Sequence, residues 1–202
     1  MSLKKWKNEF SKREFVKLIK NVANKNLYYF NYTKKPYLME KQLPDQAMMA
    51  FCFNGKHHLI AYDYAKFKRA FGKCDYTTQY VYAVQYMAHE MRHYYQERQI
   101  RAHLPDENKK SIENWKNNSI IKTRGMEEND DYKYWFSSRE LDANLYSYIF
   151  TFDHLDCAGL ATIWNKRLFN VLKKLYKQNG GKNARKYFSR RIKKSIGDMA
   201  FD

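Results

Sequence analysis

Two histidines and a glutamate lie close together in the stretch MAHEMRHYYQ, which covers residues 87–96. His89 and His93 are four residues apart, and Glu90 directly follows the first. Residues four apart share one face of an α-helix, so both imidazoles can bind a single ion. Zn2+ accepts imidazole nitrogens at about 2.0–2.1 Å, and a neighbouring carboxylate can take a proton from metal-bound water. The HExxH spacing therefore indicates metal-assisted hydrolysis; the alternative is two histidines that fall on one helix face by chance.

A catalytic zinc site needs a third protein ligand and an open position. The spacing HExxHxxGxxH is absent, because Gln96 and Gln99 stand where Gly and His would be. We predict that Glu140, in the stretch SSRELDANLYSY, supplies the third ligand from a separate helix. The competing interpretation is an ordinary exposed carboxylate near a helix start, with His154 as a reserve ligand.

Asn144 lies one helical turn after Glu140 and on the same face. We predict that it accepts a hydrogen bond from the outer nitrogen of a ligand histidine, which fixes the tautomer and the ring orientation. A hydrolase also needs a donor for the developing oxyanion. This role stays unassigned among several tyrosines, namely Tyr94, Tyr132, Tyr134 and Tyr146.

The elements that must position these residues follow from hydrophobic periodicity. Apolar runs flank Asn54-Gly55-Lys56, which predicts a β-hairpin, and 37–43 is a further candidate strand. The longest predicted helix covers 77–100, with a core face of Tyr80, Val84, Met87, Met91 and Tyr95. Further helices are predicted at 11–26 (capped by Ser11), 136–152 (capped by Ser137 or Ser138), 159–178 and 182–195. Residues 64–73 are predicted to form a short helix or loop. The polar stretch 101–131 is predicted to be mostly irregular, with some local helix possible, and forms either an excursion or a lid.

Positive charge is concentrated at the two ends of this 202-residue chain, whose net charge is +17. Residues 1–35 hold ten Lys or Arg against two acids, and residues 157–197 hold twelve and no acid. Between them, 36–156 is nearly neutral. We therefore predict a basic N-terminal helical arm (1–35), a functional core (36–156) and basic C-terminal helices (157–202). The basic ends would attract nucleic acid or an acidic partner, unless they form only a solvated surface.

The chain has no apolar stretch near the roughly 20 residues that a membrane helix needs. Its N-terminal stretch MSLKKWKNEFSKREF is charged and lacks the apolar core of a signal peptide. We expect a cytoplasmic protein without membrane contact. No CxxC or zinc-finger spacing occurs among the three cysteines.

An HExxH motif followed on a later helix by E-x-x-A-N/D is the pattern of zincins with a glutamate ligand, the gluzincins. HEMRH and ELDAN resemble most closely the compact ImmA/IrrE-type metallopeptidases, which are common on phages and mobile elements. The resemblance covers roughly residues 37–155. It implies an α+β fold: a zincin-like core with a small antiparallel sheet, an HExxH helix and a following helix carrying a Glu ligand, here with basic terminal helices added.

By this resemblance His89, His93 and Glu140 bind Zn2+, and Glu90 is the general base that also passes its proton to the leaving amine. Arg92 departs from the family, which has a small residue there; a partnership with Glu97 or solvent exposure is the simpler role. The implied function is a zinc-dependent endopeptidase acting on a protein or peptide substrate, although manganese or iron could occupy the same ligands.

Two alternatives remain open. The first is a nucleic-acid-binding or regulatory protein whose zincin-like core is not proteolytic, suggested by the basic ends and by ARKYFSRRIKK at 184–194. The second is a protein in which zinc only braces the fold. Glu90 argues against that second alternative, because a structural site has no need of a carboxylate beside the ion.

Overall fold

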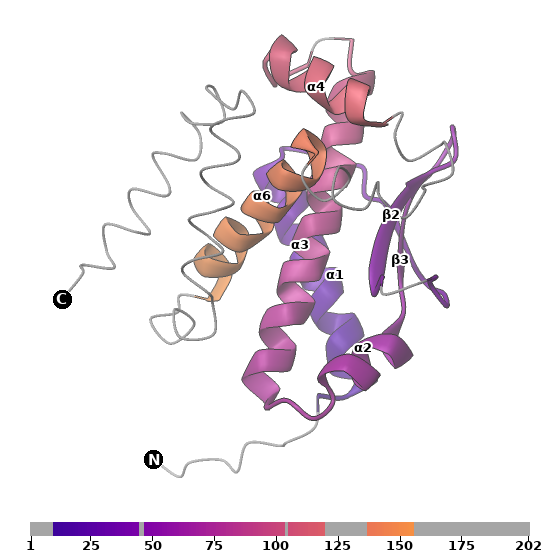
Figure 1. Cartoon of the computed structure of the whole chain (residues 1–202), viewed down its shortest axis with the longest axis vertical. Coiled ribbons are helices and arrows are strands. Elements are labelled where there is room, and N and C mark those ends of the chain that lie inside the picture. The colour runs from indigo at the N-terminus through magenta and orange to yellow at the C-terminus, as the bar shows by residue number, and fades with distance from the viewer. Residues whose placement is uncertain (1–9, 45–46, 104, 120–136, 156–202) are drawn as a thin grey trace, which may run out of the picture. The chain divides into compact units, whose positions relative to one another are not determined.

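A computed structural model describes residues 10–44, 47–103, 105–119 and 137–155 (Figure 1). The described part is α+β, with five helices and one three-stranded mixed sheet. The chain divides into two compact units, residues 1–94 and 95–202. The boundary falls inside one continuous helix, α3 (Tyr76–Arg101). We describe each unit by itself.

The first unit opens with α1 (Lys12–Tyr29), as the periodicity predicts. Ser11 caps the helix: its side chain accepts from the Glu14 backbone N–H, and the Glu14 carboxylate accepts from the Ser11 backbone N–H at 2.9 Å. This reciprocal capping box satisfies two backbone donors that a helix start leaves open. Phe10 directly precedes the cap, and its ring packs edge-on against that of Phe15, with the ring centroids 6.2 Å apart. This contact fixes the direction in which the chain enters the helix.

The sheet consists of β1 (Tyr37–Glu40), β2 (Met49–Phe53) and β3 (His58–Tyr62), in the order β1-β3-β2. The predicted hairpin is confirmed, because β2 and β3 pair antiparallel with Phe51 opposite Ile60. Gly55 has φ +84°, the conformation that makes glycine suitable for this tight turn. The prediction of a purely antiparallel sheet is wrong, because β1 pairs parallel to β3.

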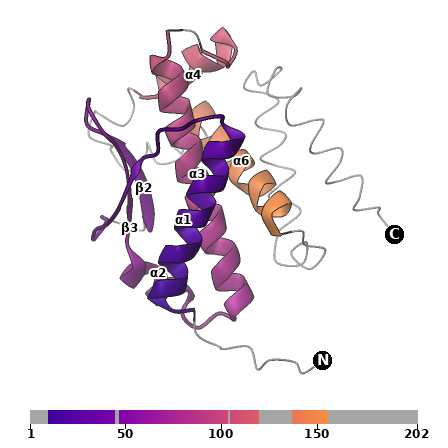
Figure 2. The same ribbon diagram turned by 180° about the vertical axis from the view of Figure 1, so that it is seen from behind.

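The core of the first unit lies between α1, the sheet, α2 (Tyr64–Phe71) and the first part of α3. Both views of the ribbon show α1 running beside α3, with the sheet on one side (Figures 1 and 2). Phe15 is fully buried and its ring lies 4.8 Å from that of Phe67. Asp63 caps α2 by accepting from the Lys66 backbone N–H.

The second unit contains the end of α3, α4 (Lys109–Ser119) and α6 (Ser138–Leu155). Trp115 of α4 is buried, and its ring meets that of Tyr95 on α3. The predicted cap of α6 is present, since Ser137 Oγ accepts from the Glu140 backbone N–H at 3.3 Å. The local helix that the sequence allowed within 101–131 is present as α4.

The helix α3 is buried far more widely than a single apolar face would allow. Val84, Met87 and Met91 of the predicted face are fully buried. Polar side chains on other faces are buried too, namely Gln79, Glu90, Arg92, His93, Gln96, Glu97 and Gln99. A helix covered this completely must give its buried polar groups partners within the protein. These partners define the site described below.

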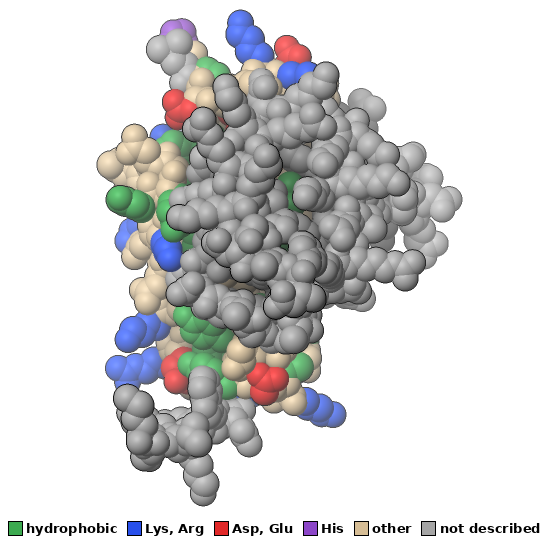
Figure 3. Space-filling view, turned by 90° about the vertical axis from the view of Figure 1, so that its left-hand side faces the viewer, with side chains coloured by type: hydrophobic (Ala, Val, Ile, Leu, Met, Phe, Trp, Pro, Cys, Tyr) green, Lys and Arg blue, Asp and Glu red, His purple; other side chains and the backbone are tan. Residues whose placement is uncertain are grey.

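On the face drawn in Figure 3, Lys and Arg side chains project at the margins of the described surface. No helix in the described ranges is long and apolar enough to span a bilayer. The predicted helices at 159–178 and 182–195, and the basic stretch 184–194, lie outside the described residues. The partition into arm, core and basic C-terminal segment stays a prediction.

Candidate metal centre

His89 and His93 face each other on α3, as their spacing of four residues predicts. Their Nε2 atoms are 3.0 Å apart, and the two rings meet edge-on with centroids 4.6 Å apart. At this distance one Nε2 can donate a hydrogen bond to the other, in a direction set by the tautomers of the two rings. His93 is 4% exposed and His89 is half-buried, so the pair is accessible from one side.

This distance is close to that of two ligands on one zinc ion. Two nitrogens at 2.0–2.1 Å from a tetrahedral ion are separated by about 3.3 Å. The imidazoles therefore need to part by only a few tenths of an ångström to hold Zn2+ between them. The small movement required means that the helix already preorganises two ligands.

Glu90 is held beside this pair by the sheet of the first unit. Its Oε2 accepts a 2.7 Å hydrogen bond from the backbone N–H of Phe51 in β2. In an antiparallel pair, every second residue exchanges hydrogen bonds with the partner strand, and the residues between point their backbone groups away from it. Met48 is hydrogen-bonded to Asp63, and Asn54 to His57, so even-numbered residues of β2 bond to β3. The backbone groups of Phe51 therefore point away from β3. The N–H of an edge strand therefore fixes the carboxylate in place, and Oε1 has no hydrogen bond to another described residue.

The helix α6 is joined to the end of α3 through Gln96, whose side chain is fully buried. Gln96 Nε2 donates to the Asp142 carboxylate at 2.7 Å and to the Arg139 backbone carbonyl at 2.9 Å. Gln96 Oε1 accepts from Arg139 Nε at 3.2 Å. Gln96 stands where the HExxHxxG spacing would have glycine, and its amide instead links the two helices.

A second link lies next to the first. The Glu97 carboxylate pairs with Arg139 on α6 at 3.3 Å and with Arg101 on its own helix at 2.6 Å. Glu97 and Arg139 are both largely buried, with side chains 11% and 15% exposed. Partners at such a depth strengthen each other, because water screens them little. Glu97 is also one turn beyond His93 on α3, so this link lies on the same face as the histidine pair.

Glu140 follows Arg139 in the first turn of α6 and is 2% exposed, so the interpretation as an exposed surface carboxylate is wrong. His89, His93 and Glu140 each offer one ligand atom, and these atoms all lie within 4.8 Å of one another. Two imidazole nitrogens and one carboxylate oxygen are the donor types of a catalytic zinc site with three protein ligands. The residues present therefore fit such an ion.

A comparison with protein-family models, with curated proteins and with solved structures found no match to this chain. What the site can do is therefore argued from its own residues.

The structure also describes three other residues that the sequence analysis named, namely Asn144, Tyr94 and Arg92. Asn144 is half-buried on α6, and its backbone carbonyl accepts from Ser147 Oγ; its predicted bond to a histidine stays a prediction. Tyr94 is fully buried and donates its hydroxyl to the Lys34 carbonyl, which gives it a structural role. Arg92 is 4% exposed, so the expectation of solvent exposure is wrong.

Tyr146 is buried beside Phe150, while Tyr132 and Tyr134 lie outside the described residues. The side chain of His154 is likewise outside them. Sequence reasoning missed Gln96, Arg139 and Asp142, which join α3 to α6. No signal in the sequence pointed to them, because polar residues of these types are common on exposed helix faces.

Proposed function

We propose that this protein is a zinc-dependent endopeptidase whose three metal ligands are His89, His93 and Glu140. The observation that carries the proposal is the close approach of one ligand atom from each of these residues, with the Glu90 carboxylate held beside the histidine pair. A structural zinc site is closed by four protein ligands. Three ligands and an adjacent carboxylate favour a catalytic site with a position left for water.

A bound Zn2+ would lower the pKa of a water molecule to about 7 and polarise the substrate carbonyl. Glu90 would accept the proton of the attacking water through Oε1, while the Phe51 N–H holds Oε2. Glu90 then returns this proton to the leaving amine, so the same carboxylate acts as base and then as acid. The hydrogen bond from Phe51 keeps the carboxylate aligned through both transfers, which reduces the reorganisation that each transfer needs.

The sheet offers a way to position an extended peptide. β2 is an edge strand, and its outward N–H at Phe51 reaches the Glu90 carboxylate. Glu90 already occupies the N–H of Phe51, so a substrate segment would pair with other outward backbone groups of β2 and gain main-chain hydrogen bonds that do not depend on its sequence. A peptide bound there would pass directly by Glu90. This arrangement supports a protein or peptide as the substrate.

The same constellation supports membership of the gluzincin type, with a zincin-like core related to ImmA/IrrE-type metallopeptidases. The supporting features are the HExxH helix, the later helix with ELDAN and the mixed sheet beside the catalytic glutamate. A cytoplasmic location and a phage or mobile-element origin belong to the same proposal.

Metal content tests the ligand set. The untagged full chain, loaded with zinc and dialysed, should hold about one zinc per chain by mass spectrometry. Glu140→Ala should lose most of it, whereas Glu113→Ala, an exposed carboxylate on α4, should keep it. The ligand assignment would be overturned if the wild type held no zinc after loading. It would also be overturned if Glu140→Ala held as much zinc per chain as the Glu113→Ala control.

Activity is tested separately with a mixture of unstructured peptides, read out by mass spectrometry. Glu90→Gln should keep its zinc and lose cleavage, because the amide cannot accept the proton. Cleavage at an unchanged rate in zinc-loaded Glu90→Gln would remove Glu90 from the mechanism. A zinc-loaded wild type that cleaves no peptide and no protein would leave the metal site standing and refute the peptidase.

A further inference from the structure

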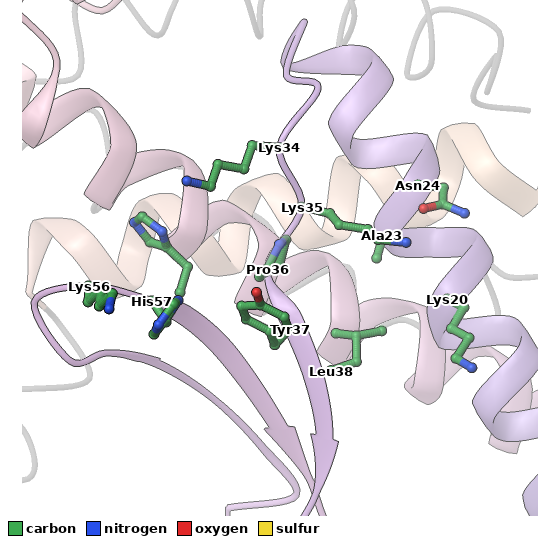
Figure 4. Close-up of a pocket in the computed structure, with 11 residues that line it drawn as sticks. Lys20, Ala23, Asn24, Lys34, Lys35, Pro36, Tyr37, Leu38, Lys56 and His57 are labelled. Atoms are coloured by element: carbon green, nitrogen blue, oxygen red, sulfur yellow. The ribbon is translucent and has the colours of Figure 1, made fainter.

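A cavity of about 680 Å3 lies in the first unit, away from the histidine pair in sequence. Three segments line it: α1 with Lys20 and Asn24, the chain from Lys34 to Leu38, and the hairpin turn with Lys56 and His57 (Figure 4). Its volume is in the range of ligand-binding pockets, which is roughly 300–1,000 Å3. The cavity is therefore large enough for a group the size of a nucleotide.

Four lysines give this cavity an unbalanced positive charge: Lys20, Lys34, Lys35 and Lys56. All four are exposed, and no Asp or Glu is among the lining residues. In the part of the chain that the structure describes, none of them forms an ion pair. Lys12, by contrast, is neutralised by Glu40 at 2.8 Å. Four uncompensated ammonium groups around one hollow repel one another, and an anion bound among them would relieve this repulsion.

Aromatic surface accompanies the lysines. The ring of Tyr37 is 65% exposed and lies on the cavity wall, with the His57 ring edge-on to it at 5.6 Å. Tyr28 is 84% exposed and lies one turn after Asn24 on the same side of α1. Exposed aromatic faces beside lysines suit flat, electron-rich groups attached to phosphates. Buried Ala23 and Pro36 give the cavity an apolar wall.

We propose that this cavity, which we call the lysine cavity (Lys20, Lys34, Lys35, Lys56 and Tyr37), binds single-stranded nucleic acid. The lysines contact phosphates, and an unpaired base stacks on the exposed ring of Tyr37. A duplex fits less well, because its bases are stacked inside and cannot reach the ring. An acidic peptide would pair with the ammonium groups but would leave the aromatic face without a partner.

The first test is binding of a fluorescent oligo-dT to the full chain at several salt concentrations, followed by anisotropy. Each phosphate contact contributes about 0.7 to the slope of log affinity against log salt. Replacing the four cavity lysines by Gln should therefore lower this slope by up to about 2.8. The matched control replaces four exposed lysines elsewhere by Gln, namely Lys73, Lys109, Lys110 and Lys116. The control should change the slope much less.

The aromatic contact has its own signature. Tyr37→Leu should weaken binding by roughly tenfold and leave the salt slope unchanged, because it removes stacking and no charge. No binding by the wild type at low salt, or equal losses in the cavity and control variants, would overturn the proposal. So would equally strong competition by tripolyphosphate or ATP, which would indicate a small phosphorylated ligand, or by poly-glutamate, which would indicate an unspecific polyanion site.

A measurement on the unmodified protein guards against misfolded variants. Oligonucleotides carrying 5-bromodeoxyuridine are cross-linked to the wild type by ultraviolet light, and the linked peptides are identified by mass spectrometry. Cross-links should fall on Tyr37 or on the adjacent cavity segments. Cross-links found only elsewhere in the chain would refute the assignment. Glu90→Gln should bind and cross-link like the wild type, since the lysine cavity does not depend on the metal centre.

Discussion

The hydrogen bond between Gln96 and Asp142 allows a quantitative test of how α6 is held against α3. Gln96→Leu removes three hydrogen bonds: the 2.7 Å bond to the buried Asp142 carboxylate, the 2.9 Å bond to the Arg139 carbonyl and the 3.2 Å bond from Arg139 Nε. A hydrogen bond to a charged group contributes about 1.5–3 kcal/mol and one to a neutral group about 0.5–1.5 kcal/mol. The long bond from Arg139 adds little, because Arg139 keeps its pairing with Glu97. Leucine nearly preserves the volume, so we expect a loss of about 2–4.5 kcal/mol in the free energy of unfolding.

The coupling energy between Gln96 and Asp142 tests their contact more specifically than the stability loss of either single variant. Asp142 is 1% exposed, so without Gln96 its carboxylate stays buried with one hydrogen bond fewer. When both residues are replaced by leucine, no buried group loses a partner across this contact, so that penalty does not arise. The double variant should therefore lose less stability than the sum of the single variants, by about 1.5–3 kcal/mol.

Urea unfolding of the metal-free full chain, followed by far-UV circular dichroism, measures all four corners of this cycle. Gln85→Leu makes the same chemical change at a half-buried position of α3 and should shift stability by no more than about 0.5 kcal/mol. Additive losses, within about 0.5 kcal/mol, would show that the two side chains are not coupled. The reasoning that places α6 through Gln96 would then be refuted.

Three further predictions concern the first unit. Two backbone N–H groups, chiefly that of Lys66 and also that of Leu43, hold the pKa of Asp63 below its usual value. The carboxylate therefore contributes stability above pH 4, and this stability is lost as the pH falls through the lowered pKa. The stability of Asp63→Asn should fall less steeply below pH 4 than that of the wild type in an acid-unfolding experiment. Phe15→Ala should cost about 3–5 kcal/mol in urea unfolding, and Phe15→Leu clearly less, because the ring fills a fully buried position. Gly55→Ala should cost about 1–2 kcal/mol through its positive φ alone, since an added Cβ meets nothing within 4 Å; an unchanged melting temperature would contradict this.

Local signals in the sequence predicted local structure well. Ser11 caps α1 as predicted, with Glu14 completing a capping box, and Asn54-Gly55 forms the predicted hairpin turn. Both depend on residues that are neighbours in the chain. The parallel pairing of β1 with β3 could not be predicted in this way, because their adjacency depends on how the hairpin docks and not on any neighbouring residue.

The candidate ligands were found because HExxH and ELDAN place chemically distinctive residues at characteristic spacings. The residues that hold them were not found, because Gln96 and Arg139 are ordinary helix residues in sequence. Their role comes from burial, which is set by the other helices. The apolar periodicity of α3 indicated one covered face, whereas the structure covers Glu90 and Gln96 as well.

The polar content of α3 itself argues for a functional site. A buried charged or polar group reduces stability unless it finds good partners, and an apolar side chain of similar size is often at least as stable. Gln96 and Glu97 have such partners, and these partners orient α6. The histidine pair is also largely withdrawn from solvent. Its Nε2 atoms face each other 3.0 Å apart, and that arrangement is better suited to a metal ion than to a helix interior.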